Sequence, residues 1–217
     1  MSSIVSFIGW HDSGKTTLVS EVVSELKTLG YKVAVIKSSN DMGIMFDTPG
    51  TDTYKHKVAG ADSVMLVAPD QMVLQTKNSG LSLRVLAHRY FPDVDIVIGE
   101  GFKTARKIPK IEVSRNPDQK LRDEVHGVIA VATNLEGVAG SYVFRLDEAK
   151  EIASFIEKRY LTRKGSRETT ALLVNGTKVV LKDFIQEALA ATVHGFVKTL
   201  KFNNDIKDIE LRIKIEK

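Results

Sequence analysis

Short apolar runs and amphipathic segments alternate along the first 160 residues of the chain. The apolar runs, which have the length and composition of buried parallel strands, are 4–8, 33–36, 94–101, 111–113 and 128–132. The segments whose apolar residues recur at helical spacing are 18–29, 53–59, 81–90 and 147–160. Because helices separate most of these strands, we predict an α/β fold with a mostly parallel sheet and helices on both faces.

Two further apolar runs, 63–67 and 72–75, flank the turn "APDQ". Two such runs around a short turn predict an antiparallel hairpin, which we expect to be attached to the main sheet. Asp52 directly precedes the helix predicted over 53–59. Aspartate is a common N-cap residue, so Asp52 is expected to cap this helix or, as an equal alternative, to act at a functional site.

The C-terminal part of the chain has a pattern of its own. After a charged linker at 160–170, strands at 171–174 and 178–181 surround Asn175-Gly176, a pair that favours a tight hairpin turn. Asp183 is placed to cap an amphipathic helix over 184–200, and 209–215 alternates like a strand. We therefore predict a main domain at 1–162 and a small ββαβ module at 168–217 of unknown role. Because so short a module is marginal alone, it is expected to pack on the main domain or on a second copy.

Composition narrows the class of protein. The 217 residues include no cysteine, which excludes disulfides, thiolate metal sites and cysteine nucleophiles. The net charge is +4, but aromatic residues make up only 7% and do not interleave with basic clusters, so no nucleic-acid partner is expected. No run has the length of a membrane span, and no secretory signal is visible. We expect a cytoplasmic protein without a membrane partner.

The stretch "GWHDSGKTT" at 9–17 lies between a predicted strand and a predicted helix. It matches the phosphate-binding pattern G-x-x-x-x-G-K-[ST] in the context that this pattern requires. Glycines allow successive N–H groups to turn inward around an anion, and the helix that follows adds its positive dipole end. The expected nucleotide-binding residues are Gly9, His11, Asp12, Ser13, Gly14, Lys15, Thr16 and Thr17.

Three residues are expected to organise the reaction at this loop. The Thr16 hydroxyl is expected to bind Mg²⁺ directly. Glu100 ends the apolar run 94–101, and ligands of open parallel sheets gather at the carboxyl ends of strands, so we expect it to bind Mg²⁺ or its water. Asp47 lies in the polar loop after the second strand and is expected to contact the metal or to orient the attacking water. Asp47 and Glu100 are thus the catalytic candidates.

A basic segment follows Glu100 directly. It contains Lys103, Arg106, Lys107, Lys110 and Arg115. A solvated loop is the ordinary explanation for such a run. Because the segment leaves the strand end that faces the nucleotide, Lys103, Arg106 and Lys107 form a candidate second anion site.

Four motifs together resemble the molybdopterin-guanine dinucleotide biosynthesis protein B family, often called MobB. They are "GWHDSGKTTL" (9–18), "FDTPGTDTYKHKVAGA" (46–61), "DIVIGEGFK" (95–103) and "PKIEVSR" (109–115). The resemblance implies a P-loop fold and a homodimer that binds GTP with Mg²⁺ and hydrolyses it weakly. It also implies partners, namely molybdopterin or its guanine dinucleotide and the guanylyltransferase that attaches GMP to molybdopterin.

The chain departs from the family pattern in three places. "SSND" follows Lys37 where many members have a histidine-rich stretch, Thr133-Asn134 stands where members often carry an aspartate, and 160–217 extends beyond the shorter members. The chain also lacks the Asn-Lys-x-Asp guanine signature, so the preference for GTP over ATP rests on the resemblance. A small-molecule P-loop kinase and a non-catalytic nucleotide-dependent adaptor remain the alternatives.

Overall fold

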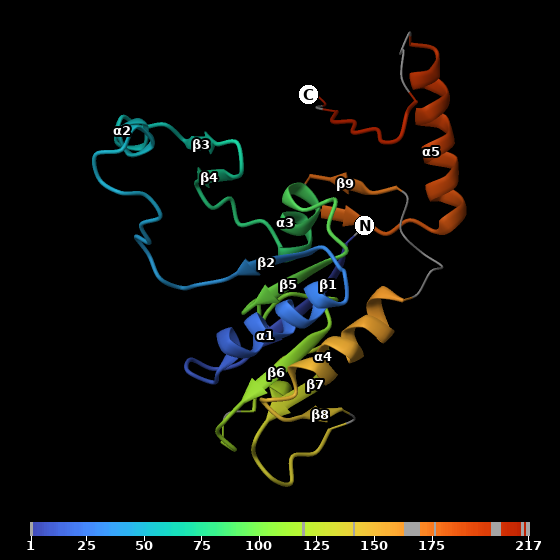
Figure 1. The fold of residues 1–217 in the computed structure, drawn as a ribbon. Helices are drawn as coiled ribbons and strands as arrows, with labels where there is room; N and C mark the ends of the chain where they lie inside the picture. Colours follow the sequence, from blue (N-terminus) through green and yellow to red (C-terminus); the bar gives the residue numbers. More distant parts are fainter. Residues whose placement is uncertain are drawn as a thin grey trace.

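The computed structural model describes residues 2–118, 120–140, 142–162, 170–175, 177–200, 205–213 and 215. Six parallel strands form its main sheet in the order β2-β5-β1-β6-β7-β8 (Figure 1). These strands are β1 (Ser3–Ile8), β2 (Val33–Lys37), β5 (Ile96–Glu100), β6 (Lys110–Ser114), β7 (Val128–Thr133) and β8 (Val143–Phe144). The two-residue strand β8 was not predicted, because two residues are too few to show a strand pattern.

Helices cover both faces of the sheet, as predicted. The helices that pack on it are α1 (Lys15–Thr28), α3 (Leu83–Tyr90) and α4 (Ala149–Ile156). The helical segment of α4 continues as a π-helical turn over Glu157–Leu161. A 3₁₀ turn, Leu121–Asp123, lies between β6 and β7.

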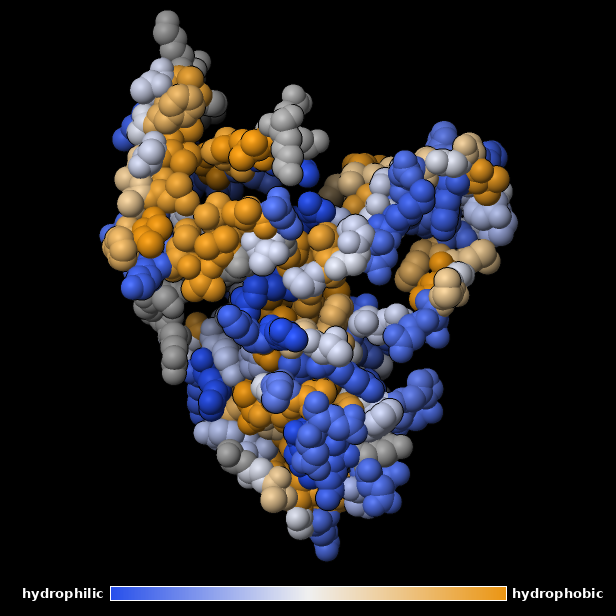
Figure 2. Space-filling model, turned by 180° about the vertical axis from the view of Figure 1, so that it is seen from behind, coloured by the Kyte–Doolittle hydropathy of each residue, from blue (hydrophilic) through white to orange (hydrophobic). Residues whose placement is uncertain are grey.

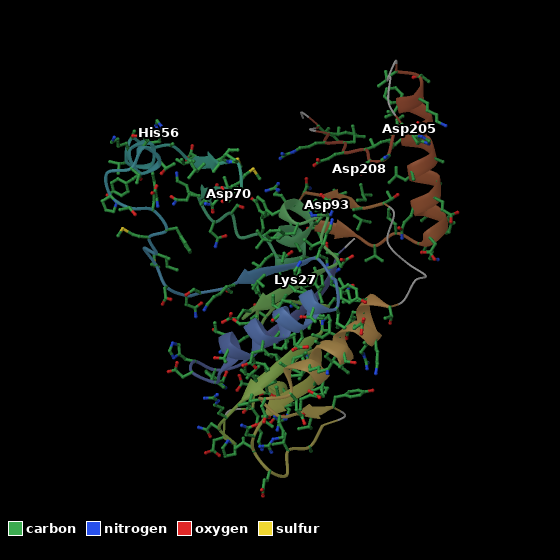
Figure 3. The ribbon with its side chains drawn as sticks, in the orientation of Figure 1. Lys27, His56, Asp70, Asp93, Asp205 and Asp208 are labelled. Atoms are coloured by element: carbon green, nitrogen blue, oxygen red, sulfur yellow. The ribbon has the colours of Figure 1, made fainter. Side chains whose placement is uncertain are left out.

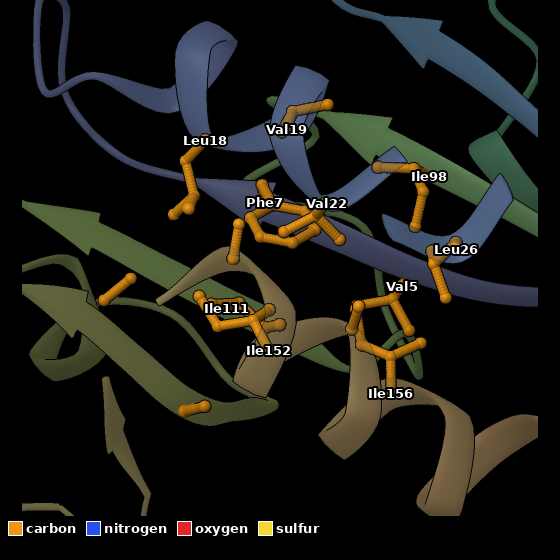
Figure 4. Close-up of a cluster of buried hydrophobic side chains, with 14 of the residues drawn as sticks. Val5, Phe7, Leu18, Val19, Val22, Leu26, Ile98, Ile111, Ile152 and Ile156 are labelled. Carbon is orange, nitrogen blue, oxygen red and sulfur yellow. The ribbon is translucent and has the colours of Figure 1, made fainter. Parts of the chain in front are cut away.

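The main core lies between the sheet and the helices α1 and α4. Alternate residues of β1, Val5 and Phe7, point into it because side chains of a strand alternate between faces. Figure 4 shows these side chains meeting Leu18 and Val22 of α1 and Ile152 of α4. On the other face a smaller cluster joins Ala34, Val97 and Ala87 of α3. The core thus fixes the end of β1 against the start of α1, where the phosphate-binding motif lies.

Residues 39–80, called the arm below, leave the sheet after β2. The arm contains α2 (Asp52–Val58), β3 (Ser63–Val67) and β4 (Met72–Thr76). Its hairpin is antiparallel as predicted, but it forms a separate two-stranded sheet, so the expected attachment to the main sheet is wrong. None of the arm residues is buried. Figure 3 shows arm side chains such as His56 and Asp70 well apart from the main sheet.

The N-cap of α2 lies one residue before its predicted position. The N-cap of α2 is Thr51, whose hydroxyl accepts the Tyr54 N–H at 3.2 Å, and Asp52 is the first helical residue. Asp52 instead pairs with Lys55 one turn later. Both positions carry side chains able to cap, and the backbone geometry decided between them.

The C-terminal segment forms a hairpin and a helix. These elements are β9 (Leu172–Val174), β10 (Thr177–Val179) and α5 (Asp183–Lys198). Asn175 has a φ of 50°, as a tight hairpin turn requires, while Gly176 lies outside the described residues. Lys182, not Asp183, is the N-cap of α5, and no side chain caps it. The strand predicted over 209–215 is wrong for the residues described there, 209–213 and 215, none of which is in a strand.

Many apolar side chains of this segment are exposed. Figure 2 shows them gathered over α5 and the neighbouring chain, where Phe184, Phe196 and Ile213 are at least 65% exposed. The described residues that form the two core clusters all lie before residue 162. The division into a main domain at 1–162 and a module at 168–217 stays a prediction.

Candidate nucleotide-binding site

The loop between β1 and α1 has the geometry of a phosphate-binding loop. Gly14, the N-cap of α1, has a φ of 89°, a backbone conformation that favours glycine. Gly9 is equally constrained, because a Cβ there would collide with the carbonyl oxygen of Val113 in β6. The loop therefore lies tight against the sheet and ends at the free N–H groups of a long helix, where an anion is stabilised.

The Lys15 side chain folds back over this loop. Its Nζ donates hydrogen bonds to the Trp10 carbonyl and, at 3.3 Å, to the Ser13 hydroxyl. Burial lowers the pKa of Lys15, and the nearby charges of Lys103 and Lys37 lower it further, although Glu100 opposes them. An anion bound here would therefore relieve repulsion among cations.

Glu100 meets the start of α1 because β5 is the direct neighbour of β1. The carboxylate is buried, with the residue 6% exposed, and its Oε1 accepts the Thr16 hydroxyl at 2.6 Å. Lys37, the last residue of β2, brings its Nζ to within 3.4 Å of the same oxygen. The strand order thus brings together two residues that lie 84 positions apart.

Thr16 and Glu100 suit a magnesium ion. Both present oxygen atoms, which Mg²⁺ prefers, and Mg²⁺ usually takes few protein ligands beside phosphate oxygens and water. Among the residues that the structure describes, no group of three or more His, Asp or Glu forms a metal site complete in itself. The pair fits an ion that arrives with a nucleotide.

Sequence reasoning did not assign two further cations to this site. Lys37 ends β2, and Arg115 directly follows β6. A Cβ on Gly14 would lie 2.9 Å from Nη2 of Arg115, so the guanidinium packs on the loop. The available signal was positional, since both residues stand at carboxyl ends of predicted strands, where ligands of such sheets gather.

The other predicted loop residues differ in exposure. Ser13 is buried under the loop, whereas Thr17 is exposed. His11 and Asp12 are almost fully exposed and contact each other at 2.8 Å through Nδ1 and Oδ2. Asp12 adopts a φ of 56°, which orients the backbone of the loop.

Asp47 does not join this group. Its Oδ1 accepts the Thr48 N–H at 2.9 Å and the Thr51 hydroxyl at 2.8 Å, both within the arm. Hydrogen bonds from Thr53 and then Thr51 lower the pKa of the Asp47 carboxyl. These contacts organise the start of α2, and a catalytic role for Asp47 stays a prediction.

The candidate second anion site is divided in space. The Lys103 Nζ lies 4.2 Å from the centre of the Trp10 ring, beside the phosphate-binding loop. Arg106 and Lys107 are exposed, and the Lys107 carbonyl accepts a hydrogen bond from Arg84 of α3 at 2.9 Å. The structure thus brings Lys103 to the nucleotide site and shows no contact of the other two with it within the described residues.

Lys110 of the same basic segment is a structural residue. It is buried, and its Nζ donates to the carbonyls of Ala105 at 2.6 Å and His126 at 2.8 Å. Burial lowers the pKa of Lys110. The ammonium fastens the segment to the chain before β7 and is not available to a ligand.

Comparisons with known proteins show the family of the chain. A family model described as "Molybdopterin guanine dinucleotide synthesis protein B" matches residues 4–134. A relative from Haemophilus influenzae named "Molybdopterin-guanine dinucleotide biosynthesis adapter protein" is 32% identical over 157 residues, which cover 71% of this chain and 87% of the relative. A relative from Methanocaldococcus jannaschii is 25% identical over 245 residues, which cover 99% of this chain and 98% of the relative.

A solved structure has the same fold. It is described as molybdopterin-guanine biosynthesis protein B (mobB), and it matches with a TM-score of 0.59 and 32% sequence identity. The match covers 71% of this chain and 98% of that one. In the described part of the chain, no helix is both long and apolar enough to cross a membrane.

Proposed function

Because the chain belongs to the molybdopterin guanine dinucleotide synthesis protein B family, we propose that it binds GTP with Mg²⁺ and acts as an adapter in making molybdopterin guanine dinucleotide. The single observation that supports nucleotide binding best is the 2.6 Å hydrogen bond between the Thr16 hydroxyl and the buried Glu100 carboxylate. This hydrogen bond joins the phosphate-binding loop to Glu100, the last residue of β5.

Each residue of the site has a distinct task in this proposal. The loop N–H groups and Lys15 bind the phosphates, and Arg115 neutralises charge at Gly14. Thr16 and Glu100 would hold Mg²⁺, Glu100 either directly or through a bound water. The bound ion supplies electrostatic stabilisation of phosphate charge. Since Asp47 forms its hydrogen bonds within the arm, the site supports weak hydrolysis at most.

The proposed partners follow from the family. The relative from Haemophilus influenzae is named an adapter protein, and we extend that role to this chain, with the guanylyltransferase that attaches GMP to molybdopterin as the partner enzyme. Molybdopterin or its guanine dinucleotide is the second ligand. Lys103 is the residue of the second anion site that lies where a pterin phosphate and the nucleotide would meet.

A homodimer is the proposed assembly. A two-stranded hairpin is marginally stable by itself in water, yet the arm hairpin buries none of its residues. Its apolar side chains include Met65, Leu66, Val67, Met72 and Leu74, all of which are exposed. Burial against a second copy would remove this apolar surface from water.

Titration of the protein with GTP and Mg²⁺, together with measurement of GTP hydrolysis, tests the proposed function. Lys15→Ala should weaken GTP binding about 10- to 100-fold, because a lost hydrogen bond to a charged group costs roughly 1.5–3 kcal/mol. Lys27→Ala is the matched control, since Lys27 is exposed in the last turn of the same helix, far from the loop (Figure 3). Equal affinity of the wild type and Lys15→Ala would contradict the nucleotide site.

Hydrolysis by the wild type and by the Glu100→Gln variant distinguishes a GTPase from a non-catalytic adaptor and from a kinase. If Glu100 organises Mg²⁺, the variant should slow hydrolysis far more than it weakens binding. Nucleotide binding without measurable turnover in the wild type would favour the non-catalytic adaptor, which the local contacts of Asp47 already support. Transfer of phosphate from the nucleotide to an added acceptor would favour the kinase.

A further inference from the structure

A cavity of about 220 Å³ lies at the carboxyl ends of β6 and β7, on the same edge of the sheet as the phosphate-binding loop. Its walls include Ser114, the last residue of β6, and Thr133, the last residue of β7. The residue after Ser114 is Arg115, whose guanidinium packs on Gly14, so one wall of the cavity is next in sequence to a residue of the candidate nucleotide site. Sites for drug-sized ligands have volumes of roughly 300–1,000 Å³. This one is smaller and suits a single flat ring system.

The cavity combines apolar walls with polar side chains, which include one carboxylate and the ammonium of Lys120. Pro117, Leu135 and Val138 supply apolar surface, and Glu136 supplies the acid. Within the described residues Glu136 has neither a hydrogen bond nor an ion pair, so both of its oxygens can accept from a ligand. Arg122 at the same cavity is already engaged, because it pairs at 3.0 Å with the buried Glu112.

Two hydrogen bonds in which a side chain accepts a backbone N–H hold the loop that carries Glu136. The Thr133 hydroxyl accepts the Leu135 N–H at 3.1 Å, which turns the chain directly after β7. Asn134 accepts the Leu146 N–H at 3.0 Å and thereby ties this loop to the chain before α4. These two hydrogen bonds hold the backbone just before Glu136, whose own side chain is exposed and open to a ligand.

We infer, resting on the proposed nucleotide function, that this cavity binds the guanine base of the nucleotide and that Glu136 determines its specificity. Guanine presents a ring N–H and an amino group side by side, and a carboxylate can accept both. Adenine presents a ring nitrogen acceptor on that edge and has no amino group there, so it would face a carboxylate with a lone pair. In the Asn-Lys-x-Asp signature the acid stands three residues after the asparagine, and Glu136 stands three residues after Thr133.

Pterins share the edge that this carboxylate would read. They also place an amino group beside a ring N–H and a carbonyl, so Glu136 alone does not separate a pterin from guanine. The position of the cavity separates the two ligands, because the cavity lies at the same edge of the sheet as the loop proposed to bind the phosphates. A base in the cavity and phosphates at Lys15 belong to one nucleotide.

Calorimetric titration of the full chain with the triphosphates of guanosine, adenosine and xanthosine tests this inference. The wild type should bind GTP at least tenfold more tightly than ATP. Glu136→Gln should weaken GTP binding about 10- to 100-fold and leave ATP binding within twofold. It should also improve binding of xanthosine triphosphate, whose ring carbonyl in place of the amino group accepts from an amide. Glu187→Gln, an exposed site on α5, is the matched control.

The outcomes separate this inference from the proposed function. A wild type that binds none of the three triphosphates contradicts the proposed function itself. A wild type that binds GTP and ATP alike, or a Glu136→Gln variant with the GTP-to-ATP ratio unchanged, overturns the inference and leaves the phosphate site standing. Titration with a free pterin tests whether the cavity binds a pterin instead of guanine. If pterin binding depends on Glu136 but the GTP-to-ATP ratio does not, the cavity belongs to the pterin and the guanine assignment is overturned.

Discussion

At the scale of single residues, the candidate nucleotide site has an excess of positive charge around one buried acid. Lys15, Lys37, Lys103 and Arg115 surround the phosphate-binding loop, and Glu100 is the buried carboxylate among them. Without a bound anion these cations repel one another, which raises the electrostatic energy of the site. A polyphosphate would remove that repulsion, which favours binding without any change of fold.

The lowered pKa of Lys15 predicts how binding depends on pH. A bound phosphate favours the charged lysine, so binding couples to its protonation. Below the pKa of the free protein Lys15 is charged in both states, and its titration should contribute no change of affinity with pH. Above that pKa a proton must be taken up on binding, and affinity should fall by up to about tenfold per pH unit. Because burial lowers this pKa from 10.5, the fall should begin below pH 10.5.

Calorimetry with inorganic triphosphate measures this pH dependence. Triphosphate replaces GTP in the experiment because the guanine ring loses a proton in alkaline solution. Lys15→Arg is the control, since arginine stays protonated over the whole range. Its curve keeps only the pH dependence of triphosphate and of the other lysines, so it should fall less steeply than the wild-type curve. If the wild type and Lys15→Arg followed the same curve, the pH dependence would not come from Lys15.

At the scale of elements, the start of α2 shows that Asp47, a catalytic candidate from the sequence, takes part in a local hydrogen-bond network. Asp47 and Thr51 form a local network with the N–H groups of Thr48 and Tyr54. This network satisfies donors that a helix start would otherwise leave without partners. These hydrogen bonds give the Asp47 side chain a structural role that needs no catalysis, and its catalytic role stays a prediction.

Thr51→Ala and Asp47→Ala test the role of this network. Loss of an N-cap costs about 0.5–2 kcal/mol, so hydrogen exchange at the Tyr54 amide should become faster in both variants. GTP hydrolysis should not change in either. Thr48→Ala is the control, because only backbone atoms of Thr48 take part in the network. A loss of hydrolysis in Asp47→Ala but not in Thr51→Ala would establish Asp47 as the water-positioning residue after all.

At the scale of the whole molecule, two apolar surfaces lie outside the core. One is the arm hairpin, and the other covers α5 and the chain that follows it. Surfaces of this kind mark interaction sites in soluble proteins. The proposed homodimer uses the arm, which leaves the C-terminal surface for another contact.

Charged substitutions distinguish the two surfaces. Leu66 and Leu74 point to opposite faces of the hairpin, since Leu66 pairs with Val73 and Leu74 pairs with Met65. Replacing both by lysine should therefore convert a particle of twice the chain mass into a monomer in sedimentation velocity. Phe196→Lys on α5 should leave the dimer intact. A monomer produced by Phe196→Lys alone would move the dimer interface to the C-terminal surface.

The sequence by itself determined the features that depend on neighbouring residues. The place of the loop at 9–17 between a strand and a helix was predicted, because its glycines and the helix that follows depend on local backbone geometry. Its nucleotide-binding role stays a prediction. Apart from β8, the strands of the main sheet and the helices on it were predicted, because their apolar periodicity records which face is buried. The N-cap position of α2 was missed because Thr51 and Asp52 both carry side chains able to cap, and that of α5 because its N-cap is Lys182, without a side-chain cap.

The tertiary structure decided what the strand order brings together. Glu100 contacts Thr16 because β5 pairs with β1, and Arg115 reaches Gly14 because β6 pairs with β1 on its other side. Sequence spacing contains no record of that order. The same holds for the arm, whose hairpin was predicted correctly but stands apart from the sheet, and for the cavity at Glu136, which exists only where the ends of β6 and β7 meet. Local chemistry therefore identified the phosphate-binding loop, while long-range pairing of strands assembled the rest of the site around it.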